Sequence, residues 1–485
     1  MIRNYFKLGL RNLAKNRLSS SINILGLALA VGCCMVVFQF LDWSIHMDSF
    51  HHKINNLFVI ERITEKKDGG QQAWGNSPSP MGPMLKNDFP QIKNFTRANY
   101  SGVIIKQGDN VFRENVTFVD DAFYKMFDFP VKWGNQQNFT SQNGIVLTEY
   151  LSNKLFGKAN PVGKNLNIRF NNKGKETMVN LTIKGVFETE PLETSWHFSA
   201  LIPRGQMEAL GITKPGDWTE TSNITFIETD QEASLAPVIQ QGKKYLQLYN
   251  AVNKDDKIVA YHYQPLKTMN FHSYAVYNNQ FNATHIAAYI MLLLIAAATL
   301  ILVYFNYMNI AIASASTRLK EIGVRKVLGS SRKQIIYQFI LENLILCTIA
   351  VIIGLYLAKY VFLPWFSQIV NVDLSKTLFT NYRTWFALLI LIILSALSGA
   401  AYPSVYVSSF NPVNIIKGNS KIGSNNRFRK SLLGLQFFLT FVAVSITITF
   451  LSETKKVKTK SWGYNPANNV VVNMDKTVNY EAFKN

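Results

Sequence analysis

Residues 315–341 read ASTRLKEIGVRKVLGSSRKQIIYQFIL and form a basic stretch between two long apolar runs. A helical pattern covers the first half, where Arg318, Glu321 and Arg325 recur at spacings of three and four and therefore share one face. Gly329 follows this pattern, and glycine is a residue type that commonly ends a helix. The stretch predicts a short charged helix that stops at Gly329.

The second half of the stretch begins another helix. Ser331 and Gln334 have the spacing of a capping box in front of the next apolar run. Arg332 and Lys333 fall in the first turn of that helix, where the helix dipole disfavours cations. Lipid phosphates or an acidic partner would account for these two charges. An ordinary basic loop on the inner side of a membrane is the alternative interpretation.

The chain of 485 residues combines membrane spans with a soluble part, since 48% of its residues are hydrophobic and only 16% are charged. Five apolar runs between charged borders are long enough to cross a bilayer, which takes about 20 residues. A cleaved signal peptide is the rival interpretation of the first run, but that run is too long for one. The five runs are Leu18–Leu41, Ile286–Ile312, Ile335–Phe362, Trp385–Val407 and Ser431–Leu451.

The formal net charge of +20 is concentrated in three short segments. Residues 1–19, 310–334 and 408–430 together hold 16 Lys/Arg and one acidic residue, whereas residues 42–283 hold 25 Lys/Arg and 24 acidic residues. A nucleic-acid surface would gather the charge on one folded domain, so a nucleic-acid partner is not expected. Basic segments beside apolar runs instead mark the cytoplasmic side of a membrane.

These charges predict one topology for the whole chain, with the amino terminus inside. The cytoplasmic parts are an amphipathic helix at 1–18 lying on the bilayer and loops at 313–334 and 408–430. The spans are expected at 19–41, 284–312, 335–362, 384–407 and 431–451. The outside parts are a domain at 42–283, a loop at 363–383 and a segment at 452–485. The fold class expected is an α-helical membrane protein with about five spans and a large α+β extracytoplasmic domain.

The outside domain at 42–283 is expected to mix strands and helices, because short β-branched runs alternate with helical stretches. It contains no cysteine, and the three cysteines of the chain all lie inside apolar runs, so a disulfide framework is excluded. The strands are predicted at Leu57–Ile63, Val103–Ile105, Val116–Val119, Ile145–Leu147, Val179–Phe187 and Ile224–Glu228. The helices are predicted at Pro80–Asp88 and Glu149–Phe156.

The histidines after the first span are the main candidates for metal ligands in the same domain. His46, His51 and His52 lie close together with two aspartates, but their spacing matches no established metal site, so a solvated linker next to the membrane is the favoured interpretation. No nucleophile elbow or zinc-protease motif occurs. The chain also lacks a phosphate-binding loop. We therefore expect neither a metal site nor an enzyme, and no ATP hydrolysis by the chain alone.

The sequence resembles the FtsX-like ABC transporter permeases. The resemblance rests on the segment from Arg318 to Gly329, RLKEIGVRKVLG, followed by QFILE at 338–342. The segments GIVLTEYLSNKLFGKANPVGKN at 144–165 and IKGVFETEPL at 183–192 resemble the MacB-like periplasmic core domain of that family. The segment 401–419, AYPSVYVSSFNPVNIIKGN, resembles the part that follows the fourth span. Residues 1–419 are thus covered in order.

The resemblance implies a multi-pass protein of the bacterial inner membrane with a large periplasmic domain. It implies mechanotransmission, in which a separate ATPase dimer binds ATP and the permease passes the motion to its periplasmic domain. Export of antibiotics, peptides or lipoproteins is the expected function, and regulation of an envelope protein is the alternative. The expected partners are the ATPase dimer, a second permease half or copy, a periplasmic or outer-membrane protein and the lipid bilayer. The residues expected to form the ATPase-coupling surface are Arg318, Lys320, Glu321, Arg325, Lys326, Gly329 and Pro412.

The carboxy-terminal part departs from a permease with four spans. A further basic segment leads into the fifth apolar run and then into the polar stretch 463–473, GYNPANNVVVN. This order of basic flank, span and outside strand is similar to that at the amino terminus, which is typical of the start of a second permease half. A truncated tandem permease is therefore expected, with a natural form of five spans as the alternative. Because isolated strands are not stable, residues 452–485 are expected to be poorly ordered in this chain.

Overall fold

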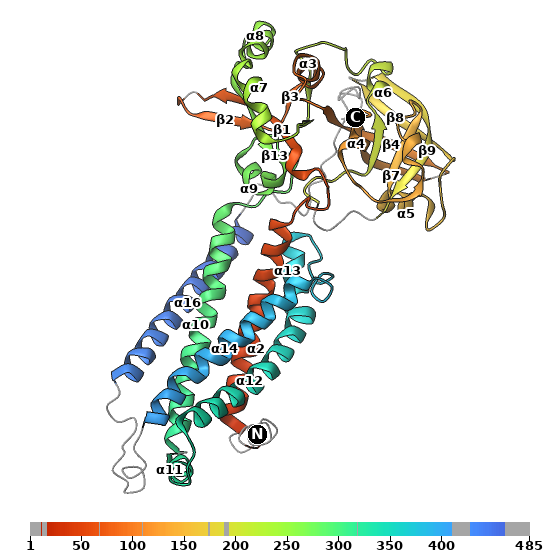
Figure 1. Cartoon of the computed structure of the whole chain (residues 1–485). Coiled ribbons are helices and arrows are strands. Elements are labelled where there is room, and N and C mark those ends of the chain that lie inside the picture. Colours follow the sequence, from red (N-terminus) through yellow and green to blue (C-terminus); the bar gives the residue numbers. More distant parts are fainter. Residues whose placement is uncertain are drawn as a thin grey trace. The chain divides into compact units, whose positions relative to one another are not determined.

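The computed structural model describes residues 11, 17–66, 68–108, 110–172, 175–188, 194–317, 319–409 and 427–460 (Figure 1). These residues form two compact units, one built from the described parts of Met1–Asp42 and Ala287–Val470 and the other from Trp43–Ile286. The predicted amphipathic helix at 1–18 lies almost entirely outside the described residues. Poor order was predicted for residues 452–485, but residues 452–459 belong to helix α16 (Arg427–Thr459), which extends the fifth apolar run. Residues 461–485 of that segment lie outside the described residues.

The first unit is a bundle of long helices, and four of the predicted apolar runs each lie within one helix. The helices are α2 (Arg17–Ile45), α10 (Ile286–Thr317), α11 (Leu319–Val327), α12 (Arg332–Leu357), α13 (Leu363–Val370), α14 (Tyr382–Ser409) and α16 (Arg427–Thr459). The run Ile335–Phe362 covers most of α12 and the π-helical turn after it, Ala358–Phe362. This turn joins α12 to α13, so the helix continues past Phe362 to Val370. The segment 363–383, predicted as a loop, therefore begins with a helix.

In the part of the chain that the structure describes, four helices have the length and composition of membrane spans. They cover Arg17–Ile45, Ile286–Ile310, Arg332–Val370 and Leu433–Thr459. In α14, the helix of the fourth expected span, the apolar stretch recognised among the described residues is shorter, Tyr382–Leu397. The helix itself runs for 28 residues, from Tyr382 to Ser409.

Helix α2 packs closely against α12 inside the bundle. A Cβ added to Gly354 of α12 would lie 2.8 Å from the backbone oxygen of Ala28 in α2. Such an approach of two backbones requires a residue without a side chain. At the end of α2, the guanidinium of Arg383 forms an ion pair with Asp42 at 2.7 Å, and Asn381 donates a hydrogen bond of 2.6 Å to the same carboxylate. These contacts attach the segment before α14 to α2.

The second unit is an α+β domain, as predicted. Its strands are β1 (Leu57–Glu65), β2 (Gln71–Trp74), β3 (Ser77–Pro78), β4 (Asn94–Gln107), β5 (Asn110–Val119), β6 (Val131–Gly134), β7 (Gly144–Thr148), β8 (Asn165–Asn172), β9 (Lys175–Phe187), β10 (Ala200–Pro203), β11 (Thr221–Ser222), β12 (Ile224–Glu228) and β13 (Ile258–Pro265). All six predicted strands are confirmed by β1, β4, β5, β7, β9 and β12. Several others, among them β8, β10 and β13, were not predicted.

The helices of this domain are short. They are α3 (Met81–Asp88), α4 (Phe123–Met126), α5 (Glu149–Phe156), α6 (Gly205–Ala209), α7 (Ala236–Gln240), α8 (Lys243–Val252) and α9 (Met269–His272). Five 3-10 turns accompany them, at Ile54–Asn56, Gln136–Asn138, Glu232–Leu235, Leu266–Thr268 and Ser273–Ala275. The two predicted helices are confirmed by α3 and α5. Helix α5 begins where the hydroxyl of Thr148 accepts a hydrogen bond from the backbone N–H of Leu151, which is a usual N-cap contact.

Strands β4, β5, β10, β7, β9 and β8 pair in this order and close on themselves, because β8 pairs with both β9 and β4. Apolar side chains fill the inside of this ring, among them Ile105, Phe118, Leu147 and Ile168, which are completely buried. Closure removes the free strand edges that would otherwise invite aggregation. Strands β12, β1 and β13 extend the sheet from β4, with β2 paired to β1 and β6 paired to β9. Strands β3 and β11 form a separate two-stranded sheet.

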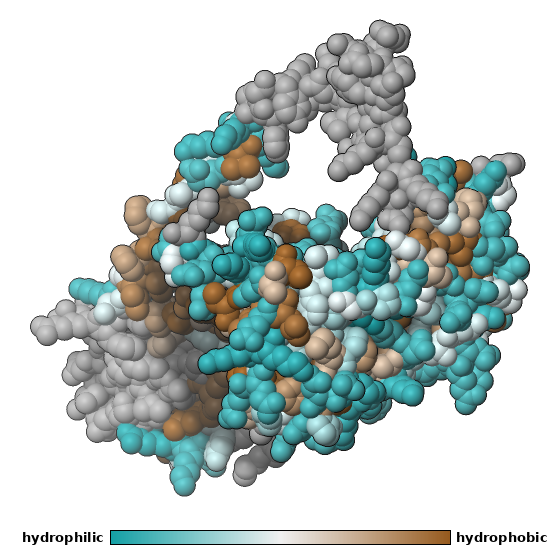
Figure 2. Space-filling model, turned by 90° about the horizontal axis from the view of Figure 1, so that it is seen from above, coloured by the Kyte–Doolittle hydropathy of each residue, from teal (hydrophilic) through white to brown (hydrophobic). Residues whose placement is uncertain are grey.

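A cluster of aromatic rings forms a second core of the domain. Phe123 lies at its centre, with its ring centroid 4.9 Å from that of Phe127 and 5.6 Å from that of Trp196. Phe129 and Phe198 also contact it. With this cluster and the filled ring of strands, the domain has the buried core of an independently folded unit. On the molecular surface seen in Figure 2, by contrast, hydrophilic residues predominate, with apolar residues in smaller patches between them.

Candidate functional site

The predicted helix of the basic loop is α11, and its ending has a defined geometry. Gly329 has φ of +95°, which favours glycine. The backbone N–H of Ser330 donates to the oxygen of Arg325 at 3.0 Å, and the N–H of Gly329 donates to that of Lys326 at 3.1 Å. This pair of bonds is a Schellman motif. The prediction that Gly329 ends the helix is confirmed.

The predicted capping box at the start of α12 is also confirmed. The hydroxyl of Ser331 accepts a hydrogen bond from the backbone N–H of Gln334 at 3.3 Å, and the side chain of Gln334 accepts one from the N–H of Ser331 at 2.9 Å. Only four residues, Leu328 to Ser331, separate α11 from α12. The two helices are therefore joined by a short turn with satisfied backbone groups.

Arg325 connects the side of α11 to the side of α12. One guanidinium nitrogen donates to Oε1 of Gln338 at 2.8 Å, and another pairs with Glu321 at 2.5 Å within α11. Arg325 thus fixes the angle between the two helices, while Glu321 holds its guanidinium in place. Burial and the nearby charge of Arg332 lower the pKa of Lys326 from its usual value.

Apolar side chains on the described surface of α11 and its turn are exposed. The exposed fractions are 52% for Val324, 64% for Val327 and 80% for Leu328. Val327 and Leu328 lie three and four positions after Val324, so the three side chains are neighbours on the helical surface. An apolar patch therefore accompanies the basic residues of α11. It was not predicted, although the residue types Val324, Val327 and Leu328 alone were a signal for it.

The other predicted coupling residues are only partly described. Lys320 lies in α11. Arg318 and Pro412 lie outside the described residues. Glu321, Arg325, Lys326 and Gly329 are brought together by α11 and its turn, as the preceding contacts show.

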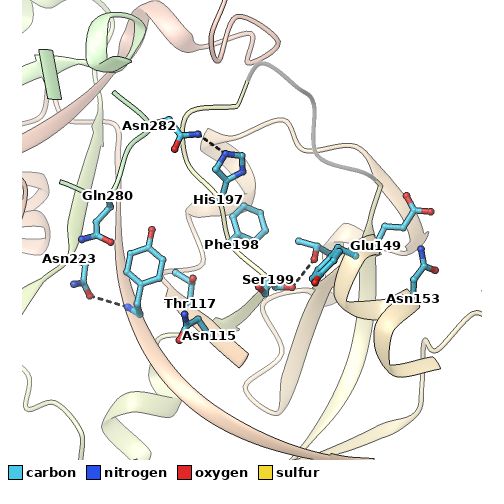
Figure 3. A pocket seen from close by; sticks show the side chains of 13 residues that line it. Asn115, Thr117, Glu149, Asn153, His197, Phe198, Ser199, Asn223, Gln280 and Asn282 are labelled. Atoms are coloured by element: carbon cyan, nitrogen blue, oxygen red, sulfur yellow. Dashed lines mark hydrogen bonds between the residues drawn. The ribbon is translucent and has the colours of Figure 1, made fainter. Parts of the chain in front are cut away.

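The α+β domain contains an open cleft with a volume of about 980 Å³ (Figure 3). Its wall comes from β4, β5, the end of β7, α5 and the segments before β10, β12 and α10. The lining is mostly hydroxyl and amide groups. The lining residues are Tyr100, Asn115, Thr117, Thr148, Glu149, Tyr150, Asn153, His197, Phe198, Ser199, Asn223, Gln280 and Asn282.

Hydrogen bonds hold several of these side chains in place. The amide of Asn282 points at His197, with its Nδ2 2.9 Å from the imidazole Nε2 (Figure 3). Asn223 accepts a bond of 3.0 Å from the backbone N–H of Tyr100. The indole of Trp196 donates to the Tyr100 hydroxyl, and burial raises the pKa of that hydroxyl. The hydroxyl and amide groups of this lining can donate and accept hydrogen bonds to a polar ligand.

The interpretation of residues 46–52 as a solvated linker is wrong for two of its members. His51 is 2% exposed, and its Nδ1 accepts a hydrogen bond of 3.0 Å from the backbone N–H of Asp128. Asp48 is 3% exposed, and its carboxylate accepts bonds from the backbone N–H and the hydroxyl of Ser195. Aromatic side chains that are distant in sequence cover this turn, which explains why its local polarity was misleading. His52 is exposed, as predicted.

A further histidine pair escaped the sequence analysis. His262 and His272 both contact the buried carboxylate of Glu61. Burial raises the pKa of Glu61, but the hydrogen bonds and charges of the two histidines outweigh this effect and leave the pKa below its usual value. The hydrogen bond to Glu61 raises the pKa of His262. Only histidines close together in sequence had been considered as candidate ligands.

Two family models match the chain, and together they cover both of its units. The MacB-like periplasmic core domain matches residues 20–245, and the FtsX-like permease C-terminal matches residues 293–412. The chain belongs to the FtsX-like ABC transporter permeases with a MacB-like periplasmic core domain. It is a multi-pass membrane protein whose MacB-like domain is periplasmic. As a permease of this family it is not itself an enzyme.

Individual relatives are distant. The chain is 29% identical over 122 residues to the macrolide export ATP-binding/permease protein MacB of Campylobacter jejuni, covering 25% of this chain and 18% of that protein. It is 22% identical over 373 residues to the uncharacterized ABC transporter permease YvrN of Bacillus subtilis, covering 72% and 85%. The solved periplasmic region of MacB from Actinobacillus actinomycetemcomitans is similar with a TM-score of 0.31 and 14% identity, covering 44% and 90%.

Proposed function

We propose that this permease passes the energy of ATP hydrolysis, carried out by a separate ATPase dimer, to its periplasmic domain in order to export an antibiotic, a peptide or a lipoprotein. The observation that carries the proposal is the exposed surface of α11 and its turn. There, Val324, Val327 and Leu328 face solvent next to basic side chains. An apolar patch rimmed by charge is the usual composition of a protein interface.

The attachment of α11 to α12 supports a mechanical role for this surface. The Schellman turn, the capping box and the bond from Arg325 to Gln338 restrain α11 on the end of α12. A partner that moves α11 would therefore move α12 with it. Helix α12 in turn contacts α2 closely at Gly354. In the proposed topology this helix bundle crosses the membrane, with α11 on the cytoplasmic side.

Capture of the ATPase tests the role of the α11 surface. The full chain is purified in detergent with its ATPase, either as wild type or with Val324→Asp and Leu328→Asp. We expect the double variant to lose ATPase binding, because a charge in an apolar contact costs several kcal/mol, of the order measured for buried unpaired charges. The matched control is Val252→Asp in α8, since Val252 is likewise 52% exposed but belongs to the periplasmic domain. Equal ATPase capture by the double variant and this control would contradict the proposal.

Charge reversal at Arg325 and Lys326 tests coupling separately from binding. We expect Arg325→Glu with Lys326→Glu to uncouple ATP turnover from transport, whereas Gln338→Ala, which removes only the link to α12, should reduce coupling and leave ATPase capture intact. The purified permease alone should show no ATPase activity. Genuine ATP hydrolysis by the permease alone would refute the division of labour between the two proteins.

The topology is tested with single cysteines in a chain whose three native cysteines have been replaced. A membrane-impermeant thiol reagent added to intact cells should label a cysteine at Ser141 and not one at Ser330. The opposite labelling pattern would overturn the proposed sides of the membrane.

The cleft of the periplasmic domain favours a peptide among the three kinds of cargo. Asn223, Gln280 and Asn282 line it with amide groups that match the donors and acceptors of a peptide backbone. Crosslinking from a photoreactive residue at Gln280 should trap exported peptide. An envelope enzyme or receptor trapped at the same position would instead favour a regulatory permease.

A further inference from the structure

Three potential metal ligands converge in the periplasmic domain. Glu61 lies on β1 and His262 on β13, and the antiparallel register of these strands pairs the two residues directly. The chain then turns through a 3-10 helix into α9, which returns His272 to the same carboxylate. The Oε2 atom of Glu61 is 3.3 Å from Nδ1 of His262 and 2.9 Å from Nε2 of His272. The three donor atoms all lie within 4.8 Å of one another.

The carboxylate of Glu61 is in an unusual position for an acidic side chain. Its side chain is 0% exposed, whereas those of His262 and His272 are 50% and 34% exposed. Its second oxygen, Oε1, has no hydrogen-bond partner among the described residues. A buried carboxylate oxygen without a partner is costly. The two imidazoles are the exposed members of the cluster, and the carboxylate is the buried one.

We propose that Glu61, His262 and His272 bind a Zn²⁺ ion. Two imidazole nitrogens and one carboxylate oxygen are an established set of three protein ligands for zinc, with a water molecule in the fourth position. Donors about 2.0–2.2 Å from a tetrahedral ion are separated by roughly 3.3 Å. The two distances to Glu61 are close to this value, and a bound ion would draw the two imidazole nitrogens, which lie within 4.8 Å of each other, to the same separation.

The ion would connect β1 to β13 and α9, which lie 201 and 211 positions further along the chain at His262 and His272. Glu61 belongs to the first strand of the domain, and His272 belongs to the segment that leads along the chain to α10. A zinc ion there would fix α9 to the β1–β13 pair. The site would therefore stiffen the last part of the periplasmic domain, independently of any ATPase partner. A purely structural ion pair between Glu61 and the two histidines is the competing explanation.

Zinc titration of the full chain tests the proposal. The protein is purified in detergent, treated with a chelator and titrated with Zn²⁺ by calorimetry. We expect one ion per chain, and at least about tenfold weaker binding in His262→Ala and in Glu61→Gln. The matched control is His52→Ala, because the side chain of His52 is 88% exposed and belongs to another part of the domain. This control should bind zinc like the wild type.

A second measurement needs no variant and so does not depend on how well the variants fold. Co²⁺ bound to the wild type should give the strong visible absorption of a tetrahedral ion, and added Zn²⁺ should remove it. Absence of stoichiometric zinc binding, a weak octahedral cobalt spectrum, or equal zinc affinity in the wild type and His262→Ala would each overturn the site. The last outcome would assign the bound zinc to other residues and leave Glu61 as a partner of an ion pair.

Discussion

Replacing His51 by asparagine should make the periplasmic domain less sensitive to acid. His51 is 2% exposed and lies against the rings of Phe127 and Phe129, with centroid distances of 5.1 Å to each. Its Nδ1 accepts a hydrogen bond from the backbone N–H of Asp128, so this nitrogen carries no proton and the imidazole is neutral. The side-chain oxygen of asparagine can take the place of Nδ1 and accept the same N–H. The substitution therefore removes the titrating ring but retains the hydrogen bond.

The magnitude follows from the change in the pKa of His51. Burial lowers this pKa from 6.5 to about 4, an effect that Asp128 opposes and His52 reinforces. The folded state thus prefers the neutral ring, and the stabilisation is fully present above the unfolded pKa of 6.5 and is lost as the pH falls towards 4. Between about pH 7.5 and about pH 4.5 the free energy of unfolding of the wild type should fall by roughly 2.5 kcal/mol more than that of the variant.

The assay is denaturant unfolding of the full chain in detergent, followed by tryptophan fluorescence at a series of pH values. The variant loses the packing of the ring at every pH, so at neutral pH its free energy of unfolding should be lower than that of the wild type. This difference should shrink as the pH falls, because only the wild type loses the stabilisation that depends on a neutral His51. Asp48, whose pKa burial raises to about 6, titrates in both proteins, and its effect cancels in the difference. A difference between the two proteins that stays constant from neutral to acid pH would refute the assignment of a buried, neutral His51.

Two glycine substitutions test the packing of the two units. Gly185→Ala should destabilise the periplasmic domain by about 1–3 kcal/mol, because the new Cβ would lie 2.2 Å from the ring of Phe139. Gly102→Ala is the control. Its Cβ would lie 3.7 Å from the nearest atom, so the stability should change by less than about 0.5 kcal/mol. Gly354→Val should lower the melting temperature of the helix bundle by at least about 4 °C, because its Cβ meets the backbone of α2. Gly434→Val should lower it less, because a Cβ at Gly434 has no described atom within 4 Å. Calorimetry of each pair of variants measures both effects, and equal values within a pair would contradict the packing.

The candidate coupling site was predictable to the extent that it depends on local pattern. Gly329, Ser331 and Gln334 ended one helix and began the next as predicted, because caps involve residues only three to five positions apart. The bond from Arg325 to Gln338 was not predictable in the same way. It requires α11 to fold back onto α12 at one particular angle, and residue spacing alone does not specify that angle.

Sequence alone determined where the long helices lie, which segments carry the positive charge and which family the chain resembles. Each of these properties depends on neighbouring residues, through the length of apolar runs and the spacing of charges. Tertiary structure decided the closed ring of strands, the burial of His51 and the meeting of Glu61 with His262, which are 201 positions apart. These features depend on strand register and on the packing of distant side chains. A shift of one residue in the pairing of β1 with β13 would turn Glu61 and His262 to opposite faces, and no local pattern in either strand prevents such a shift.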